Sequence, residues 1–383
     1  CNTYKRCGGC NLRHVKYEET LKMKQNAVQS LVNKTLKNKL QIKETVGMEN
    51  PLHYRNKAQY PIGINKKGEP VIGVFANRTH EVIPIDNCLI QNKKSEEIAK
   101  FIIEFIKEKN ISIYDEKKGK GLVRHIVTKV GIKTGEIMCV IVINGHKIPN
   151  ENELVENLKT RYPEIKAIVK NINMKNTNVI LGQENINLYG NGYIEDILGE
   201  YKFKISPLSF YQVNPVQAEK LYNLGVSMAE ITKNDVVFDL YCGIGTISLF
   251  MSKFAKKVYG IEIVEEAVKM AKENAQNNNV SNTEFFAGDV EIVLDDLINN
   301  KGLKADVVMF DPPRKGLDKK SIDNILNIRP KKIVYISCNP ATLIRDLADF
   351  ENEYDIKTII PVDMFPYTSH VECVSVLQLK QDV

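Results

Sequence analysis

The segment VVFDLYCGIGT at residues 236–246 decides the fold of the second half of this chain. Its apolar first part predicts a buried strand, and Gly243 and Gly245 predict a tight turn that opens a helix. Strands and helices alternate from this segment onward, which predicts a mostly parallel, doubly wound α/β sheet. The expected strands are 236–240, 256–263, 283–289, 305–311 and 331–338, and the expected helices are 246–254, 264–278, 319–327 and 341–350.

Two further β segments, 355–365 and 370–379, follow the last of these helices, and we expect them to form an antiparallel hairpin at the edge of the sheet. The earlier part of the chain has a different pattern that mixes helices with hairpins. It has an amphipathic helix near 17–36, a second helix at 95–109 and a hairpin around Lys133-Thr134-Gly135. We therefore expect an α+β domain at residues 1–200 and an α/β domain at residues 201–383.

The composition is that of a globular protein, with 383 residues, 43% of them hydrophobic and 26% charged. No apolar run approaches the roughly 18–20 residues that cross a bilayer, and there is no secretion signal, so we expect a cytoplasmic protein with no membrane partner. The net charge is +6, but residues 1–60 hold twelve Lys/Arg and four Asp/Glu, a net of +8. Such a basic block suits a nucleic-acid partner, and the alternative is a solvated lysine-rich face.

The eight cysteines include a cluster, C-x5-C-G-G-C, formed by Cys1, Cys7 and Cys10. Without a secretion signal, a disulfide framework is not expected. A closed metal site needs a fourth ligand, and Cys88 is the nearest remaining cysteine. Three clustered thiolates with one distant thiolate favour an iron–sulfur cluster. Structural zinc, which more often uses two C-x2-C pairs, and a site without metal are the alternatives.

Acidic residues follow the predicted strands at the edge where ligands of open α/β sheets bind. Asp239 precedes the glycine loop, Glu262 ends the next strand, and Asp289 ends the third. A nicotinamide site would want a third glycine, but residues 246–248 are Thr-Ile-Ser. Acids beside the loop suit S-adenosylmethionine, which carries a sulfonium and an ammonium group and no phosphate. The alternative is a glycine turn with incidental acids. The candidate cofactor residues of this region are Gly243, Gly245, Thr246, Glu262 and Asp289.

The sequence SCNP at 337–340 places Cys338 at the end of the fifth predicted strand. Asn339 suits a helix cap and Pro340 suits the first helical position, so Cys338 is expected beside a helix N-terminus that favours its thiolate. The alternative is an inert buried cysteine. DPPRKG at 311–316 lacks the aromatic residue that follows D/N-P-P in amino-group methylation, and Arg314 in its place disfavours that chemistry.

Glu372 opens the last predicted strand among valines, where an acid is costly to bury without a role. Its alternative role is an ion pair with Arg345 or a lysine. A thiol, a carboxylate and a methyl donor together suggest methylation of a pyrimidine at C5. Addition of a thiolate at C6 makes C5 nucleophilic, and a base then removes the C5 proton. Cys338 would be the nucleophile and Glu372 the base.

These residues together resemble the bacterial RNA uracil-5-methyltransferases, most closely the iron–sulfur branch that forms 5-methyluridine in 23S ribosomal RNA. The motifs that carry the resemblance span the chain: the cysteine cluster with its distal cysteine, FYQVN (210–214), DLYCGIGT, DPPRKG, SCNPATLIRD and DMFPYTSHVECV. The resemblance implies a Rossmann-like methyltransferase domain, with Cys338 as the nucleophile and Glu372 as the base. It also implies a 4Fe–4S cluster on Cys1, Cys7, Cys10 and Cys88, and contacts to S-adenosylmethionine from Gln212, Tyr241, Glu262 and Asp311.

The resemblance implies further features of the whole molecule. The helix within about 13–45 is expected to pack on the catalytic domain, and an RNA-binding β-barrel is expected upstream of the first cluster cysteine, where this chain begins. The target uridine is expected to be extruded from folded RNA, with Tyr54, Tyr60 and Phe365 as candidates to stack on bases. We expect a monomer.

Four functions compete. The sequence favours a 23S rRNA uracil-5-methyltransferase, because the tRNA branch of the family lacks the cluster cysteines. A tRNA T-loop uridine methyltransferase is the alternative of the same class. A non-catalytic RNA-binding or ribosome-assembly factor would not need Cys338 and Glu372. An iron–sulfur redox protein would be expected to carry a flavin or nicotinamide fingerprint.

Overall fold

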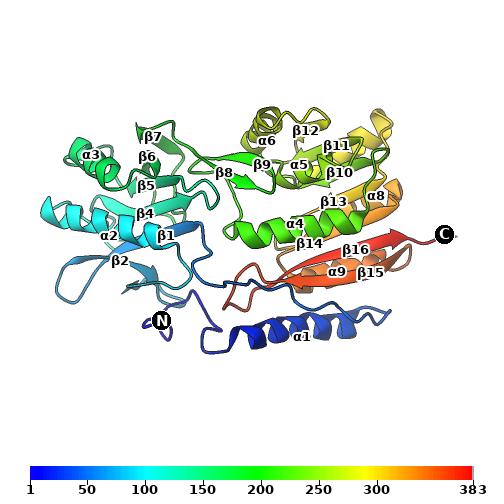
Figure 1. Cartoon of the computed structure of the whole chain (residues 1–383), viewed down its shortest axis with the longest axis horizontal. Helices are drawn as coiled ribbons and strands as arrows, with labels where there is room; N and C mark the ends of the chain where they lie inside the picture. The colour runs from blue at the N-terminus through cyan, green and yellow to red at the C-terminus, as the bar shows by residue number, and fades with distance from the viewer. Residues whose placement is uncertain (382–383) are drawn as a thin grey trace. The chain divides into compact units, whose positions relative to one another are not determined.

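The computed structural model describes residues 1–381, and its contacts divide the chain into two compact units. The first unit consists of Cys1–Arg13 and Asn50–Pro215. The second consists of His14–Glu49 and the chain from Val216 onward (Figure 1). The second unit therefore includes a segment from near the start of the sequence.

The second unit is built on a seven-stranded sheet with the order β12-β11-β10-β13-β14-β16-β15. The strands β10 to β14 pair in parallel, whereas β16 is antiparallel to both of its neighbours. The first residue of β16 therefore lies at the same edge as the carboxyl ends of the parallel strands. The strands are β10 (Val236–Leu240), β11 (Lys257–Glu262), β12 (Thr283–Ala287), β13 (Val307–Phe310), β14 (Lys332–Ser337), β15 (Tyr354–Val362) and β16 (Glu372–Leu379).

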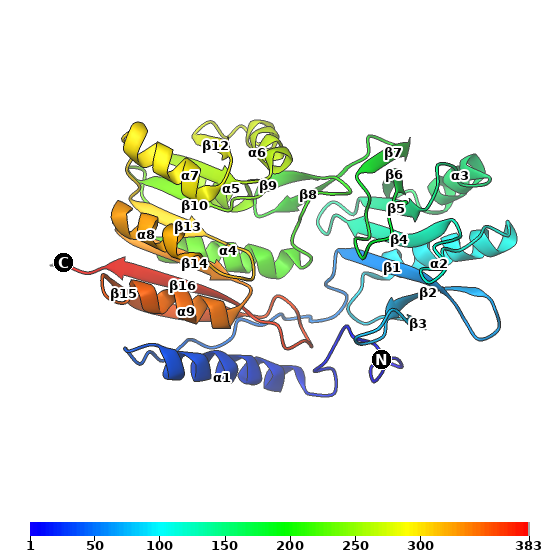
Figure 2. The ribbon, with the colours of Figure 1, turned by 180° about the vertical axis from the view of Figure 1, so that it is seen from behind.

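Helices cover both faces of this sheet, so the predicted doubly wound α/β fold is confirmed. The helix α4 (Pro215–Ala229) lies on one face, in front in Figure 1, and α8 (Lys319–Ile328) and α9 (Pro340–Phe350) lie on the other, in front in Figure 2. The sequence analysis did not predict α4, or the short α7 (Val290–Asp295) with the π-helical turn Asp296–Asn300 after it. The C-terminal half of this unit also contains the helices α5 (Thr246–Ser252) and α6 (Glu265–Asn277).

The helix α1 (Tyr17–Thr35) belongs to this unit. Its buried residues recur every four positions along one face: Thr20, Lys24, Val28 and Val32. Val28 and Val32 join the same hydrophobic core as Leu347 and Phe350 of α9. The chain after α1 then runs beside β15, with Lys43 N donating to Ile359 O at 3.0 Å and Val46 N to Pro361 O at 2.9 Å.

The first unit holds a second seven-stranded sheet, in the order β3-β2-β1-β4-β5-β6-β7, together with the helices α2 (Lys93–Glu108) and α3 (Glu151–Arg161). This α+β architecture and the β4–β5 hairpin agree with the prediction, whereas α3 was not predicted. The strands are β1 (Lys57–Ile64), β2 (Pro70–Phe75), β3 (Val82–Pro84), β4 (Val123–Val130), β5 (Ile137–Ile143), β6 (Ile165–Ile172), β7 (Glu184–Tyr189), and the separate pair β8 (Ile194–Leu198) and β9 (Tyr201–Ile205).

The division between the units falls after Pro215 and not near residue 200. The β8–β9 pair is held to the turn between β4 and β5, where Thr134 Oγ1 donates to Glu195 O at 2.6 Å and Lys133 N donates to Asp196 Oδ1 at 2.9 Å. Tyr211 OH also donates to Asp196 Oδ2 at 3.3 Å. These contacts keep the chain up to Tyr211 with the first unit.

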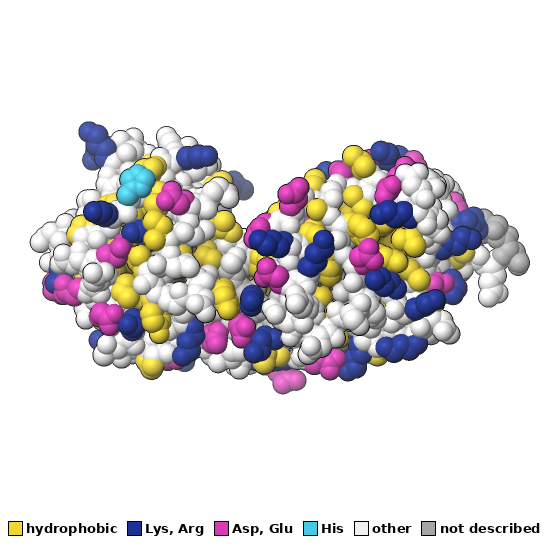
Figure 3. Space-filling view, turned by 90° about the horizontal axis from the view of Figure 1, so that it is seen from above, with side chains coloured by type: hydrophobic (Ala, Val, Ile, Leu, Met, Phe, Trp, Pro, Cys, Tyr) yellow, Lys and Arg dark blue, Asp and Glu magenta, His cyan; other side chains and the backbone are white. Residues whose placement is uncertain are grey.

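Within residues 1–381, no helix is both long enough and apolar enough to cross a membrane. On the face shown in Figure 3, lysine and arginine side chains are interspersed with aspartate and glutamate. The described residues of that face therefore present charges of both signs to a partner.

Candidate active site

The loop after β10 has the backbone geometry of a ligand-binding turn. Tyr241, Gly243 and Gly245 all have positive φ, at 64°, 55° and 80°, which is unusual for a tyrosine. A Cβ on Gly245 would come within 3.1 Å of both the Ala271 Cβ and the Phe285 ring, whereas a Cβ on Gly243 would meet nothing within 4 Å. Gly245 is therefore required by packing and by conformation, and Gly243 leaves its side of the loop open.

Glu262 ends β11 and its carboxylate turns toward this loop. Its Oε2 accepts a hydrogen bond from Gly243 N at 3.1 Å, and its Oε1 accepts one from Val264 N at 3.0 Å. Each carboxylate oxygen keeps a second lone pair that can accept a hydroxyl proton. The structure thus joins Gly243 and Glu262 in one site, as the sequence suggested.

Asp239 lies beneath the loop as a buried carboxyl with 1% exposure. Its Oδ2 accepts a hydrogen bond from Ser248, and its Oδ1 has no partner among residues 1–381. The pKa of Asp239 is raised to about 7, mainly by burial and in part by the negative charges of Asp311 and Glu262, while hydrogen bonds from Ser248 oppose the rise. Three carboxyl groups therefore converge here, and an orphaned acceptor among them suits a ligand that brings positive charge and N–H donors.

The other predicted cofactor residues surround the same edge of the sheet, with one exception. Asp289 caps α7 by accepting from Glu291 N at 2.9 Å, and its charge contributes to raising the pKa of Tyr241 after the larger effect of burial. Thr246 is the first residue of α5. Gln212 belongs to the first unit, and its backbone carbonyl accepts a hydrogen bond from Asn56 Nδ2.

The strand register brings the predicted nucleophile and base together. Ser337, the last residue of β14, is paired with Cys373 of β16 in the antiparallel ladder. Cys338 follows Ser337 and Glu372 precedes Cys373, so these two residues come just beyond the last pair of the ladder, and the charge of Glu372 acts on the Cys338 thiol. The sequence identified both residues but contained no sign of this pairing.

The charged groups around Cys338 have opposite effects on the pKa of its thiol. Burial, then the negative charges of Glu372 and Asp311, raise the pKa of the Cys338 thiol, while the neighbouring Arg314 guanidinium lowers it. The expectation that the thiolate is favoured is therefore wrong for this structure: Cys338 does precede α9, whose cap is Asn339 as predicted, but burial and two carboxyls outweigh that effect.

Glu372 is buried, with 4% exposure, and its pKa is raised by burial and by the charge of Asp311. No lysine or arginine among the described residues forms an ion pair with it, so the alternative of a pair with Arg345 does not hold. Arg345 instead pairs with Asp346 and donates to the carbonyl of Lys315 at 3.0 Å. Because burial and Asp311 raise its pKa to about 8, the Glu372 carboxylate is a stronger base than an exposed glutamate, which suits removal of a proton from carbon.

Arg314, which the sequence suggested as a contact for a phosphate or a base edge, also acts on both predicted catalytic residues. Its charge acts on Cys338 and on Glu372, and its carbonyl is held by Asn339 Nδ2 at 3.0 Å and by Thr342 Oγ1 at 3.3 Å. These bonds join the DPPRKG loop to the start of α9. The signal in the sequence was the position of Arg314 just after the Asp311 strand end.

The cysteines of the first unit lie partly together. The pKa of Cys10 is raised to about 11, mainly by burial and in part by the charges of Cys88 and Cys7, so the Cys10 thiol interacts with both of them. Cys1 is exposed, and its sulfur lies 3.5 Å from Thr3 Oγ1. No three Cys, His, Asp or Glu side chains in the described part of the chain are arranged to hold a metal ion, so a 4Fe–4S cluster or a zinc ion remains a prediction.

Two of the three aromatic residues expected to stack on bases are not available for it. Tyr54 and Tyr60 are 5% and 0% exposed. Tyr60 belongs to the hydrophobic core of the first unit. Side chains alternate between the two faces of β1, and the Tyr60 side chain lies on the buried face. Phe365 is partly exposed, on the loop before Glu372.

Comparison with known proteins places the chain in a family. The family model described as tRNA (Uracil-5-)-methyltransferase matches residues 16–380. An "Uncharacterized RNA methyltransferase" of Clostridium acetobutylicum is 48% identical over 382 residues, covering 99% of this chain and 83% of the relative. One of Staphylococcus aureus (strain COL) is 45% identical over 381 residues, covering 99% and 84%.

A solved structure is similar across both units. The Pyrococcus abyssi tRNA (uracil-54, C5)-methyltransferase, in complex with S-adenosyl-L-homocysteine, superimposes with a TM-score of 0.79 and 28% sequence identity. The similarity covers 97% of this chain and 86% of that one. With the family model matching nearly the whole chain, this protein belongs to the tRNA (uracil-5-)-methyltransferase family.

Proposed function

We propose that this protein transfers the methyl group of S-adenosylmethionine to C5 of a uridine in RNA. The observation that carries the proposal is the register of β14 and β16, whose last pair, Ser337 with Cys373, brings Cys338 and Glu372 to the edge where the carboxyls of Asp239, Glu262 and Asp311 lie. Membership of the uracil-5-methyltransferase family and the likeness to a structure that binds S-adenosyl-L-homocysteine support it. A non-catalytic RNA-binding factor has no need of this arrangement.

The donor pocket consists of the acids and the glycine loop. S-adenosylmethionine, when bound, supplies an electrophilic methyl group on a sulfonium. The Oδ1 atom of Asp239, which has no partner among the described residues, and the carboxyl of Asp311 would face its positive charges. Glu262 would accept the ribose hydroxyls, and Asp289 the adenine amine. The remaining contacts are proposed for Gln212, Tyr241, Gly243, Gly245 and Thr246.

The residues of the β14–β16 edge would carry the reaction of the base. The Cys338 thiolate adds to C6 of the uracil, which places electron density on C5 so that C5 attacks the methyl group. Glu372 then removes the proton from C5, the electron pair re-forms the C5–C6 double bond, and the Cys338–C6 bond breaks. The positive charge of Arg314 favours the thiolate that begins the sequence.

We propose 23S ribosomal RNA as the substrate, on the basis of the cysteines that the tRNA branch lacks. The second candidate is the T-loop of tRNA, favoured by the likeness to the Pyrococcus abyssi enzyme. Nucleoside mass spectrometry decides between them after incubation with unmodified 23S rRNA fragments or unmodified tRNA. We expect 5-methyluridine in the rRNA and none with Cys338→Ala. Product in tRNA alone would reverse the substrate assignment, and product with Cys338→Ala would refute the nucleophile.

We also propose that Cys1, Cys7, Cys10 and Cys88 hold a 4Fe–4S cluster with a structural role, because the reaction needs no electron. Closing the site would require Cys1 to approach the other three thiols. Protein purified without oxygen should contain about four irons and absorb visible light. Cys7→Ser should lose the iron and weaken folding or RNA binding. A variant that keeps both its cluster and full activity would contradict this assignment, and stoichiometric zinc would favour the alternative.

A further inference from the structure

The loop at residues 363–371 joins β15 to β16 and leads directly into Glu372. In the pairing of these strands, Val362 lies opposite Glu372. Asp363 is therefore the next residue after the partner of the proposed base. Asp363 is therefore connected to Glu372 in two ways, through the Val362–Glu372 pair of the ladder and along the loop itself.

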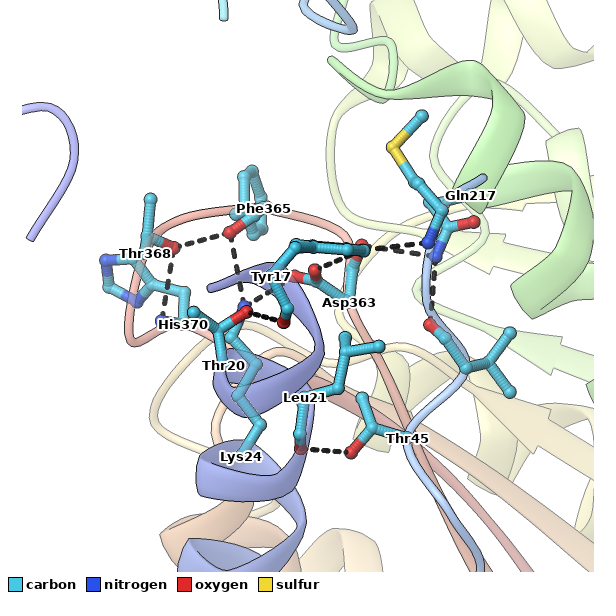
Figure 4. A network of polar contacts seen from close by, with 12 residues as sticks. Tyr17, Thr20, Leu21, Lys24, Thr45, Gln217, Asp363, Phe365, Thr368 and His370 are labelled. Atoms are coloured by element: carbon cyan, nitrogen blue, oxygen red, sulfur yellow. Dashed lines mark hydrogen bonds and ion pairs between the residues drawn. The ribbon is translucent and has the colours of Figure 1, made fainter. Parts of the chain in front are cut away.

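Both carboxylate oxygens of Asp363 are bound by side chains of α1 (Figure 4). Lys24 Nζ lies 2.5 Å from Oδ1, and these two side chains are 2% and 0% exposed. Tyr17 OH donates to Oδ2 at 2.7 Å and accepts from Met48 N at 2.8 Å. Lys24 also donates to the carbonyl of Phe365 at 3.2 Å, so one ammonium group holds the loop at two points.

The backbone of Asp363 is held as firmly as its side chain. Its N–H donates to Val46 O at 2.9 Å, and its carbonyl accepts from Gln217 Nε2 at 3.2 Å. Gln217 Nε2 also donates to Val46 O at 3.0 Å. Farther along the loop, Thr368 Oγ1 donates to Phe365 O at 2.8 Å (Figure 4). Segments distant in sequence thus fix the start of the loop.

The stability of the fold alone does not explain why α1 carries a buried ion pair between Lys24 and Asp363 at this position. The same face of α1 continues with Val28 and Val32, which are fully buried in the core. Desolvating two charges offsets much of their attraction, and apolar residues of similar volume often stabilise a fold as well or better. A buried pair does, however, fix one geometry in a way that apolar contacts do not. Its position, one residue from the partner of Glu372, makes that geometry relevant to the base.

We propose that Lys24 and Tyr17 are positioning residues, which hold Asp363 and thereby set Glu372 against the carbon that carries the proton. The proposal rests on the proposed function, since it assumes that Glu372 is the base. Without the anchor, Cys338 can still add to the base and C5 can still take the methyl group. Proton removal from C5, and the breaking of the Cys338–C6 bond that follows, would be slowed.

The test compares variants for steady-state kinetics on a uridine-containing RNA and for a protein–RNA adduct that survives denaturing electrophoresis. Lys24→Met keeps the length of the side chain and removes the charge. We expect kcat to fall about tenfold, with KM for RNA nearly unchanged, and the adduct to accumulate. Tyr17→Phe should also lower kcat and increase the amount of adduct, with smaller changes than in Lys24→Met. Val28→Ala, one turn along α1, is the matched control and should lower Tm without changing kcat or forming adduct.

Glu372→Gln separates this proposal from the one on which it rests. Accumulation of adduct in Glu372→Gln, and its loss when Cys338→Ala is added, supports the nucleophile and the base. If Lys24→Met then behaves like Val28→Ala, the positioning role is refuted while the proposed function stands. If Lys24→Met does not fold, the test depends on Tyr17→Phe. A Tyr17→Phe variant with the kcat of the wild type and no accumulated adduct would overturn the positioning role. No adduct in Glu372→Gln refutes the proposed function itself.

Discussion

In the proposed reaction Cys338 and Glu372 both act after losing a proton, and burial and nearby charge make this loss harder for each of them. Burial and neighbouring negative charge raise both pKa values, with Asp311 acting on both residues. The site therefore suits a ligand with positive charge, such as the proposed sulfonium methyl donor, because that charge would offset the repulsion among the ionised groups. The same residues without a ligand hold their protons to higher pH than exposed side chains do.

This arrangement predicts the pH dependence of the reaction. Because the reactive forms of Cys338 and Glu372 are the deprotonated ones and both pKa values are raised, kcat/KM should increase from neutral to alkaline pH. Asp311→Asn removes a charge that raises both values, so the rising limb should move to lower pH even though the maximal rate falls. Initial rates across the pH range, for both proteins, test this. A limb that stays in place would show that Asp311 does not act on these groups.

Asp239 predicts a selective effect on the two forms of the donor. Asp239→Asn keeps the shape but removes the charge that would face a sulfonium, so S-adenosylmethionine should bind about tenfold more weakly and the uncharged thioether product much less so. The buried carboxyl has a raised pKa, so its ionised form destabilises the fold as pH rises through about 7, and Asn should raise Tm at alkaline pH. Titration calorimetry with both ligands measures the first effect. Equal losses for both would contradict it.

At the scale of elements, α9 connects the nucleophile to the DPPRKG loop through its cap. Asn339 accepts from Ala341 N at 3.2 Å and donates to Arg314 O at 3.0 Å. Asn339→Ala should cost about 1 kcal/mol of stability for the lost cap and also lower kcat. Asn339→Asp keeps the cap acceptor but loses the donor to Arg314, so it should retain stability and still lower kcat. Chemical denaturation and steady-state kinetics check the pair. Full activity in Asn339→Asp would show that the tie to Arg314 has no role.

Most of the elements from β10 onward followed from the sequence, because they are long enough to show their period, whereas α4 and α7 were not predicted. The helix α7 was missed since it has six residues and is defined by its cap, Asp289, more than by a periodic face. The face of α1 illustrates a second limit. Lys24 falls in line with buried valines, and only the presence of Asp363 explains why a lysine is tolerated there.

At the scale of the whole molecule, the second unit is completed by a segment from the start of the chain. Residues 14–49 supply α1 and the strand-like stretch beside β15. Without them, the core residues of α9 and the carboxylate of Asp363 would be exposed. We expect a fragment of residues 216–383 to melt without a cooperative transition, and a fusion of residues 14–49 to its N-terminus through a flexible linker to restore one. Circular dichroism and calorimetry provide the measurement. A cooperative melt of the shorter fragment would mean that α1 is not needed for the fold.

The sequence by itself determined the α/β class, the glycine loop, the acids at the strand ends, and the identities of Cys338 and Glu372. These are local signals, read from period, spacing and residue type. Only the tertiary structure decided that the β14–β16 ladder brings Cys338 near Glu372, that Asp311 raises both of their pKa values, and that Lys24 and Tyr17 hold the loop before Glu372. Register, burial and ion pairing join residues from separate elements, more than 300 positions apart in the case of Lys24 and Asp363, and no local pattern encodes which of them will meet.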